Sequence, residues 1–335
     1  MRILVTGGAG YIGTHTCVAL LQSNHEVLVF DNLSNSSPGA IDRIKLITNK
    51  SVEFIEGDIR DHALLLQVVR EFSPEAVIHF AGLKAVGQSV KDPLQYYDVN
   101  VRGSIELLKA ISSVDCNLII FSSSANVYGL PEYLPYDEDH PTAPTNPYGQ
   151  SKLMVENILQ DWIKTNNSRR ALCLRYFNPV GSHISGSIGE DPKNVPNNLM
   201  PLIVQTAAGI QEYLSIFGDD YDTRDGTGER DYIHVSDLAN GHLLALEKHE
   251  LLDRFQVINL GTGSGTTVKE LIEEFEICTN QKIKIKISAR RSGDIAKCYA
   301  DTTLAAKLLD FKCEKSISDM CIDSWNWQKQ DFQDY

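Results

Sequence analysis

The sequence predicts an α/β protein: a doubly wound parallel sheet followed by a smaller C-terminal α/β domain. Two observations lead to this fold class. Short β-branched runs alternate with helical segments over the first 177 residues, and such alternation builds a parallel sheet with helices on both faces. The pattern changes after about residue 177: the segment 178–198 is irregular and rich in Gly, Pro, Ser and Asn, as functional loops often are. The pattern is of the Rossmann type, which binds ligands beyond the carboxyl ends of the strands.

The predicted elements follow one another in regular alternation. Strands are expected at 3–5, 27–30, 53–56, 76–80, 118–122 and 171–175. Helices are expected at 12–22, 61–71, 93–114 and 147–165. A later helix at 236–248 and a strand at 257–260 could return to the first sheet. We therefore expect one domain over 1–177, with returning elements near 234–262, and a second over 178–335.

The first predicted strand runs directly into a glycine cluster. Gly8, Gly10 and Gly13 match G-x-G-x-x-G, and Gly7 adds a fourth glycine. Glycines let the backbone approach a pyrophosphate, and the following helix offers its N-terminal amides. Asp31 follows about 20 residues later, where an acid accepts hydrogen bonds from a ribose 2′-hydroxyl and repels a 2′-phosphate. The cluster predicts NAD rather than NADP binding; the alternative is a turn that only eases strand–helix packing.

Composition excludes several classes of function. The 335 residues carry a formal net charge of −13, and an acidic surface repels nucleic-acid phosphates and anionic lipids. No apolar run approaches the roughly 20 residues of a membrane span, and the chain opens on a core strand rather than a signal peptide. The seven cysteines form no C-x-x-C pair, and the nine histidines show no H-x-x-x-H spacing. We expect a cytoplasmic protein with reduced thiols, no metal site, and no nucleic-acid or membrane partner.

The second informative cluster is Tyr148 with Lys152. The two lie four residues apart on a predicted helix, so their side chains face the same way. An ammonium near a phenol lowers the pKa of the phenol, which lets a tyrosine exchange a hydroxyl proton near neutral pH. The buried run at 119–124 ends in three serines, of which we expect Ser124 to share a hydrogen bond between a substrate hydroxyl and Tyr148. The alternatives are a surface Tyr–Lys pair and a serine that caps a turn.

Together these residues resemble the extended short-chain dehydrogenase/reductase superfamily. Six further strings narrow the resemblance to the UDP-glucose 4-epimerase family, over nearly the whole chain. They are DNLSN at 31–35, EGDIR at 56–60, HFAGLKAV at 79–86, RYFNPVG at 175–181, PNNLMP at 196–201 and GTGERDYIH at 226–234. The resemblance implies a retained NAD cofactor, a UDP-sugar substrate held mainly by the C-terminal domain, and a homodimer joined through the helices at 93–114 and 147–165.

The resemblance also implies roles for individual residues. The cofactor would contact Gly7, Gly10, Tyr11, Ile12, Gly13, Asp31, Asn32, Asn35, Asp58, Ile59, Phe80, Ala81, Gly82, Lys84, Tyr148, Lys152 and Phe177. The UDP-sugar would contact Ser124, Asn178, Asn198, Leu199, Phe217, Arg230, Tyr232, Arg291, Asp294 and Cys298. The two arginines suit this role because a guanidinium can bind a diphosphate through two hydrogen bonds. Without the resemblance, each would be read as part of a surface ion pair.

The implied reaction is inversion at C4 of a UDP-hexose, a step of galactose and nucleotide-sugar metabolism. The C4 hydrogen is not acidic, so inversion requires oxidation. Tyr148 takes the 4-hydroxyl proton while hydride leaves for NAD⁺, the 4-keto sugar turns over, and hydride returns to its other face. The chain would thus be an isomerase with no net redox change.

Three alternatives remain for the activity. A nucleotide-sugar 4,6-dehydratase would carry Asp-Glu after the strand-end hydroxyl, where this chain has Ala125 and Asn126. A net oxidoreductase that releases NADH would need stoichiometric NAD. A non-catalytic NAD-sensing protein would need no Tyr148–Lys152 pair.

The chain departs from the family pattern at three positions. Val99 replaces an asparagine that touches the cofactor, and Asn126 stands where threonine is common. Cys298 stands at a position near the C2 group of the sugar, where some members carry tyrosine. Because cysteine is smaller, we expect an N-acetyl group to fit and UDP-GlcNAc and UDP-GalNAc to react as well. The alternative is that Cys298 only packs and Tyr299 covers the same space.

Overall fold

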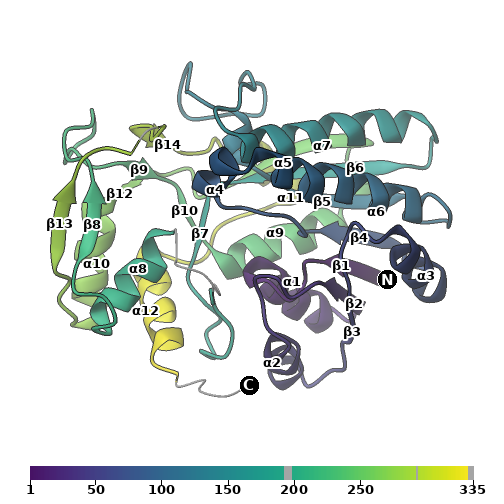
Figure 1. The fold of residues 1–335 in the computed structure, drawn as a ribbon, viewed down its shortest axis with the longest axis horizontal. Coiled ribbons are helices and arrows are strands. Elements are labelled where there is room, and N and C mark those ends of the chain that lie inside the picture. Colours follow the sequence, from purple (N-terminus) through teal and green to yellow (C-terminus); the bar gives the residue numbers. More distant parts are fainter. Residues whose placement is uncertain (192–197, 292, 331–335) are drawn as a thin grey trace.

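A seven-stranded sheet forms the centre of the structure (Figure 1). The computed structural model describes residues 1–191, 198–291 and 293–330. In space the strands follow the order β11-β6-β5-β4-β1-β2-β3, and all neighbours pair in parallel. Their bounds are β1 Arg2–Thr6, β2 Glu26–Asp31, β3 Glu53–Glu56, β4 Ala76–His79, β5 Leu118–Ser124, β6 Arg170–Tyr176 and β11 Phe255–Leu260. The order reverses between β1 and β4, and in such sheets the ligand crevice opens there, beyond the carboxyl ends of the strands.

Both faces of the sheet are apolar because alternate side chains of each strand enter different cores. In β1, Ile3 and Val5 pack into one core and Leu4 into the other. Helices α1 Tyr11–Gln22, α2 Gly39–Thr48, α9 Val235–Glu247 and α11 Thr303–Leu309 cover the first core. Helices α3 His62–Phe72, α6 Gly103–Ile111 and α7 Pro147–Lys164 cover the second. The predicted doubly wound fold class is therefore confirmed.

The last strand of the sheet comes from far along the sequence. The run predicted at 257–260 lies within β11, which pairs with β6 from Phe255 opposite Ala171 to Leu260 opposite Tyr176. The helix that precedes it, α9, packs against α1. Elements beyond residue 234 thus complete the first sheet, whereas the domain division at residue 177 stays a prediction.

The single helix predicted over 93–114 is wrong. The chain instead forms α4 Val86–Lys91, α5 Pro93–Tyr96, a π-helical stretch Tyr97–Arg102, and then α6. The side chain of Asn100 explains the irregular turn, because it accepts a hydrogen bond from the Leu83 amide at 2.7 Å and donates one to the Leu83 carbonyl at 3.0 Å. These bonds pin the π-helical turn to the loop after β4, where a ligand would lie. Helix α2 was not predicted from the sequence.

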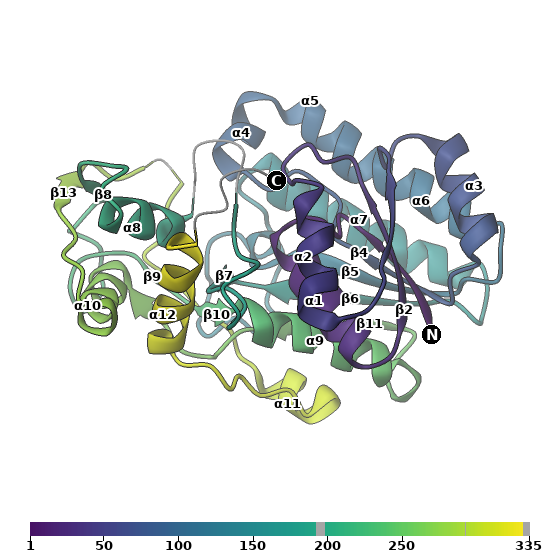
Figure 2. The same cartoon turned by 90° about the horizontal axis from the view of Figure 1, so that it is seen from below.

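The remaining elements form a smaller α/β part, which lies at the end of the molecule away from α3 (Figures 1 and 2). Its helices are α8 Leu199–Ala207, α10 Val268–Thr279 and α12 Ile317–Gln328. Its strands are β7 Asn178–Val180, β8 Leu214–Phe217, β9 Glu229–Arg230, β10 Tyr232–His234, β12 Thr266–Thr267, β13 Ile285–Ser288 and β14 Lys297–Cys298. A third core, which includes Met200, Phe275 and Met320, joins the three helices.

Two 3₁₀ turns complete the described elements, at Ala125–Val127 and His249–Leu251. Within the described ranges, no helix is both long enough and apolar enough to cross a bilayer.

Candidate active site

The glycine loop between β1 and α1 is too crowded for side chains. Gly7 has a φ of +72°, and a Cβ there would lie 2.5 Å from the amide nitrogen of Ala81. A Cβ on Gly13 would lie 2.4 Å from the carbonyl oxygen of Gly7. Gly10 is the N-cap of α1 and offers no side-chain acceptor, so the amides of the first turn point out of the helix end without a capping side chain. An anionic ligand suits this position.

Asp31 ends β2 beside this loop. Its carboxylate accepts hydrogen bonds from the Ala9 amide at 3.1 Å, the Leu33 amide at 2.8 Å and the Ser36 hydroxyl at 3.1 Å. The acid therefore joins the glycine loop to the end of β2, and the predicted ribose contact of Asp31 stays a prediction. Asn35 is exposed a few residues further on.

The predicted adenine side is an ion-pair cluster at the end of β3. Asn32 donates to Asp58 at 3.1 Å, and Arg60 pairs with both Asp58 and Asp98 at 2.7 Å. The hydrogen bond from Arg60 holds the pKa of Asp58 well below its usual value. Ile59 between them is buried in the second core. Arg60 thus orients a predicted ligand residue, a role that the sequence analysis did not assign to it.

The predicted nicotinamide side is the loop after β4. The amides of Phe80 and Ala81 both donate to the Thr6 carbonyl, at 2.9 and 3.0 Å, so the loop closes over the glycine turn. A Cβ on Gly82 would lie 3.0 Å from the Asn100 side chain. Ile12, at the start of α1, packs on the first core beneath the loop.

Tyr148 and Lys152 lie on the first turns of α7, as predicted. Asn146 caps this helix by accepting a hydrogen bond from the Gly149 amide at 2.9 Å, and Pro147 stands in the first turn, where its missing N–H costs nothing. Tyr148 is 7% exposed and Lys152 5%. The Lys152 ammonium donates to the Ser122 carbonyl at 2.7 Å and lies 5.9 Å from the centre of the Tyr148 ring. Ser124, the last residue of β5, accepts a hydrogen bond from the Asn126 side chain at 3.1 Å, and its hydroxyl is near enough to the Tyr148 phenol to lower the pKa of that phenol.

The pKa of Tyr148 differs from the expectation. Burial raises the pKa of the phenol above its usual value, and the hydrogen bond with Ser124 offsets this only in part. Burial also lowers the pKa of Lys152 to about 8, against the opposing field of Glu156. Spacing in the sequence reveals the ammonium next to the phenol but not the burial of the site. The cost of placing a charge in a buried site dominates here.

Several predicted substrate residues lie on neighbouring short strands. Arg230 of β9 is in register with Cys298 of β14, and Tyr232 of β10 with Asn178 of β7. The Arg230 guanidinium donates to the Glu229 carbonyl at 2.9 Å. Burial raises the pKa of the Cys298 thiol to about 12, so this thiol is uncharged at neutral pH.

A second group of predicted substrate residues gathers around Phe217. The Arg291 guanidinium lies 4.8 Å from the Phe217 ring centre and donates to Asp294 at 2.9 Å. Tyr221, which the sequence analysis missed, lies in the electrostatic field of both Arg230 and Arg291. Its hydroxyl is buried without a hydrogen-bond partner among the described residues.

Glu190, also missed from the sequence, joins the cofactor and substrate sides. Its carboxylate accepts from Lys84 at 2.9 Å and from Asn198 at 2.7 Å, two residues predicted to hold different ligands. The Tyr11 hydroxyl, in the field of Glu190, donates to the Gly181 carbonyl at 2.6 Å. A shared partner for residues 114 positions apart could not be read from spacing in the sequence.

Comparison with known proteins identifies the family. Residues 3–261 match the model of the NAD dependent epimerase/dehydratase family. The chain belongs to this family. The UDP-glucose 4-epimerase of Haemophilus influenzae is 53% identical over 336 residues, which cover 100% of this chain and 99% of that protein. The enzyme of the same name from Bacillus subtilis is 51% identical over 335 residues, with the same coverage. The crystal structure of UDP-glucose 4-epimerase from Stenotrophomonas maltophila, with bound NAD and formylated UDP-arabinopyranose, matches with a TM-score of 0.95 and 48% identity over 98% of both chains.

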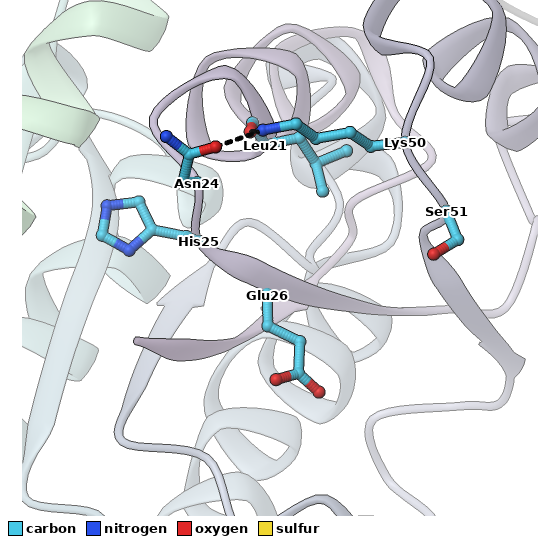
Figure 3. A pocket seen from close by; sticks show the side chains of 6 residues that line it. All are labelled: Leu21, Asn24, His25, Glu26, Lys50 and Ser51. Carbon is cyan, nitrogen blue, oxygen red and sulfur yellow. Dashed lines mark hydrogen bonds between the residues drawn. The ribbon is translucent and has the colours of Figure 1, made fainter.

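A hollow on the opposite edge of the sheet has no part in this site. It is lined by Leu21, Asn24, His25, Glu26, Lys50 and Ser51 (Figure 3). Glu26 begins β2, so the hollow lies at the amino ends of the strands, away from Tyr148. Lys50 there donates hydrogen bonds to the Leu21 carbonyl, in the last turn of α1, and to the Asn24 side chain.

Proposed function

We propose that this chain interconverts UDP-glucose and UDP-galactose by epimerisation at C4, with NAD as a retained cofactor. The observation that carries the proposal is the meeting of Tyr148, Lys152 and Ser124 at the carboxyl edge of the sheet, close to the switch between β1 and β4. The full-length similarity to UDP-glucose 4-epimerases supports it. Residues 1–177, with the returning elements near 234–262, would hold NAD, and residues 178–335 would hold the UDP-sugar.

The glycine loop fits a dinucleotide. Gly7 and Gly13 leave no room for a Cβ, α1 presents uncapped amides, and Asp31 stands at the end of the next strand. Pyrophosphate would lie against this loop, with the adenosine near Asn32 and Asp58 and the nicotinamide near Phe80 and Phe177. NAD, when bound, supplies the hydride acceptor and donor and a positive ring near the phenol.

The acid–base work falls to side chains of α7 and β5. Tyr148 takes the proton of the sugar 4-hydroxyl and returns it after the 4-keto sugar has turned. Ser124 shares the hydrogen bond, and Lys152 supplies the positive charge that favours the phenolate against the effect of burial. The Lys152 ammonium also holds the end of β5 through the Ser122 carbonyl.

The sugar nucleotide would be anchored by the smaller part of the structure. Arg230 and Arg291 would bind the diphosphate, and Phe217 would stack on the uracil ring. Asn178, Asn198, Leu199, Tyr232 and Asp294 would complete the contacts. The anchor matters for mechanism, because the keto sugar must present its other face while its diphosphate stays in place.

Cys298 is proposed to leave room for an N-acetyl group. It packs on a cluster that includes Ala125, Tyr136 and Phe177. Ala125 follows Ser124 in the chain, and Phe177 is among the predicted cofactor contacts. UDP-GlcNAc and UDP-GalNAc would then also be substrates. The alternative, that Tyr299 covers this space, predicts activity on the non-acetylated pair only.

Exposed apolar side chains on three helices bear on the assembly of the protein. Val90 on α4, Leu94 on α5 and Met154 on α7 are 63, 77 and 37% exposed. An apolar face across these helices suits a homodimer, which light scattering would detect as twice the 37.3 kDa chain. We propose that this dimer works in the cytoplasm on free UDP-sugars.

The proposal is tested by incubating the purified protein, without added NAD, with UDP-galactose and separately with UDP-GalNAc. Chromatography should reveal UDP-glucose and UDP-GlcNAc respectively. Product from UDP-galactose alone would keep the epimerase and remove the acetylated pair. Failure with both sugars, in a protein shown to contain NAD, would refute the proposed function.

A further inference from the structure

A third polar residue continues the row of Tyr148 and Lys152 along α7. Glu156 lies one further turn on, at the same four-residue step, and the side chain is 4% exposed. A carboxylate is costly to bury unless it is paired. The Arg175 guanidinium of β6 supplies the pair, with Nε donating to Oε1 at 3.0 Å and Nη2 to Oε2 at 2.6 Å.

The same carboxylate is tied to the catalytic end of β5. The Ser123 hydroxyl donates to Oε1 of Glu156. Ser123 stands between Ser122, whose carbonyl accepts from the Lys152 ammonium, and Ser124, which meets Tyr148. Glu156 is therefore bonded to the segment that holds both the lysine and the catalytic serine.

Glu156 is the negative charge that favours the protonated form of Lys152, because the other acidic or neutral titratable groups around Lys152 are uncharged. From β4, His79 is kept neutral because burial lowers its pKa to about 3. From β6, burial raises the pKa of Cys173 well above its usual value, so this thiol is uncharged. Tyr176 and Tyr96, which both lie in the field of Tyr148, also have pKa values raised by burial.

We propose that Glu156, held by Arg175 and Ser123, is a positioning residue for the acid–base pair, which keeps Lys152 protonated and fixes the end of β5. The inference rests on the proposed function, since it requires Tyr148 and Lys152 to act on the sugar hydroxyl. Glu156 itself touches neither sugar nor cofactor. Its charge acts through Lys152, and the charge of Arg175 limits that action.

The two partners predict opposite effects on the pH profile. Glu156→Gln removes a negative charge, so Lys152 should lose its proton at lower pH, and the alkaline limb of kcat for UDP-galactose should move down by about one pH unit. Arg175→Gln removes the guanidinium, which raises the pKa of the buried Glu156 carboxyl; at alkaline pH, above that raised pKa, the carboxylate is unopposed, so the limb should move to higher pH. Glu156→Asp keeps the charge and should restore the limb to near the wild-type position. KM should change little in all three variants.

Thermal unfolding first establishes which variants fold, because a broken buried pair is destabilising. If Glu156→Gln does not fold, Arg175→Gln is compared with the double variant Glu156→Gln/Arg175→Gln. These two differ only in the charge of Glu156, so the limb should lie lower in the double variant.

Three results would overturn the inference: no alkaline limb in the wild-type protein, a limb that stays in place in every folded variant, or shifts of the same direction from both partners. A merely structural role would give lost stability without opposite shifts. Tyr148→Phe, made in the wild-type protein, separates failure of this inference from failure of the proposed function. If Tyr148→Phe keeps full activity, the proposed function is refuted. If Tyr148→Phe is inactive but the limb does not move in the Glu156 and Arg175 variants, only the role of Glu156 is refuted.

Discussion

The glycine loop yields a prediction in which strain and collision can be separated. Gly7 combines a φ of +72° with a Cβ position 2.5 Å from the Ala81 amide. Gly209 has a φ of +74° with no atom within 4 Å, and Gly13 has a collision at 2.4 Å without a positive φ. Gly209→Ala therefore tests backbone strain alone, Gly13→Ala tests collision alone, and Gly7→Ala tests both together.

The magnitudes follow from these two effects. A left-handed backbone costs an L-residue about 1–2 kcal/mol, which is all that Gly209→Ala should lose. Overpacking against fixed backbone costs about 1–3 kcal/mol, so Gly13→Ala should lose that amount and Gly7→Ala about 2–5 kcal/mol. At about 2 °C per kcal/mol for a chain of this size, the Tm of Gly7→Ala should fall by about 4–10 °C.

Cofactor content is the discriminating readout. Gly7→Ala and Gly13→Ala displace the loop that would hold the pyrophosphate, and a displacement worth about 3 kcal/mol weakens binding by more than 100-fold. Both variants should be purified with little NAD, measured by acid release and chromatography, while Gly209→Ala keeps the wild-type amount. These expectations are refuted if Gly7→Ala retains the wild-type amount of NAD and has the same Tm as Gly209→Ala.

Three further predictions concern single side chains. Tyr148→Phe should lower kcat for UDP-galactose by about 10²–10⁴-fold at unchanged NAD content, because it removes the proposed acid–base group; an unchanged kcat contradicts this. Arg230→Met should raise KM for UDP-galactose by at least about tenfold, with a smaller effect on kcat, since it would remove the proposed charged contact to the diphosphate; steady-state kinetics with an unaltered KM would remove Arg230 from the site. Cys298→Tyr should abolish turnover of UDP-GalNAc and spare UDP-galactose, with Cys298→Ser as the control that keeps both. Persistent UDP-GalNAc turnover in Cys298→Tyr would end its role as a gate.

The sequence predicted those features whose causes are local. Strand β1, the glycines and α1 follow one another directly, and each constrains the next through sterics and hydrogen bonding. The row Tyr148 and Lys152 is visible because helical spacing alone brings the two together. The motif strings carried the family assignment, which the comparisons confirmed.

Features that depend on distant pairing escaped the sequence analysis. Glu190 meets Lys84 only because the two parts of the fold are packed together, and Arg175 meets Glu156 only because β6 lies beside β5. The direction of the Tyr148 pKa also depends on burial, which the spacing of charged residues does not reveal. The break at Asn100 arose from a tertiary contact with the loop after β4, which helical periodicity cannot report.

The central claim is oxidation at C4 followed by return of the same hydride within one site. It is tested most directly with UDP-galactose deuterated at C4, incubated with the purified protein in ordinary water without added NAD. Mass spectrometry and NMR of the UDP-glucose formed should find the deuterium retained at C4. UDP-glucose that has lost the label to solvent would contradict the account, because it would mean that C4 inverts by proton exchange and not by hydride transfer.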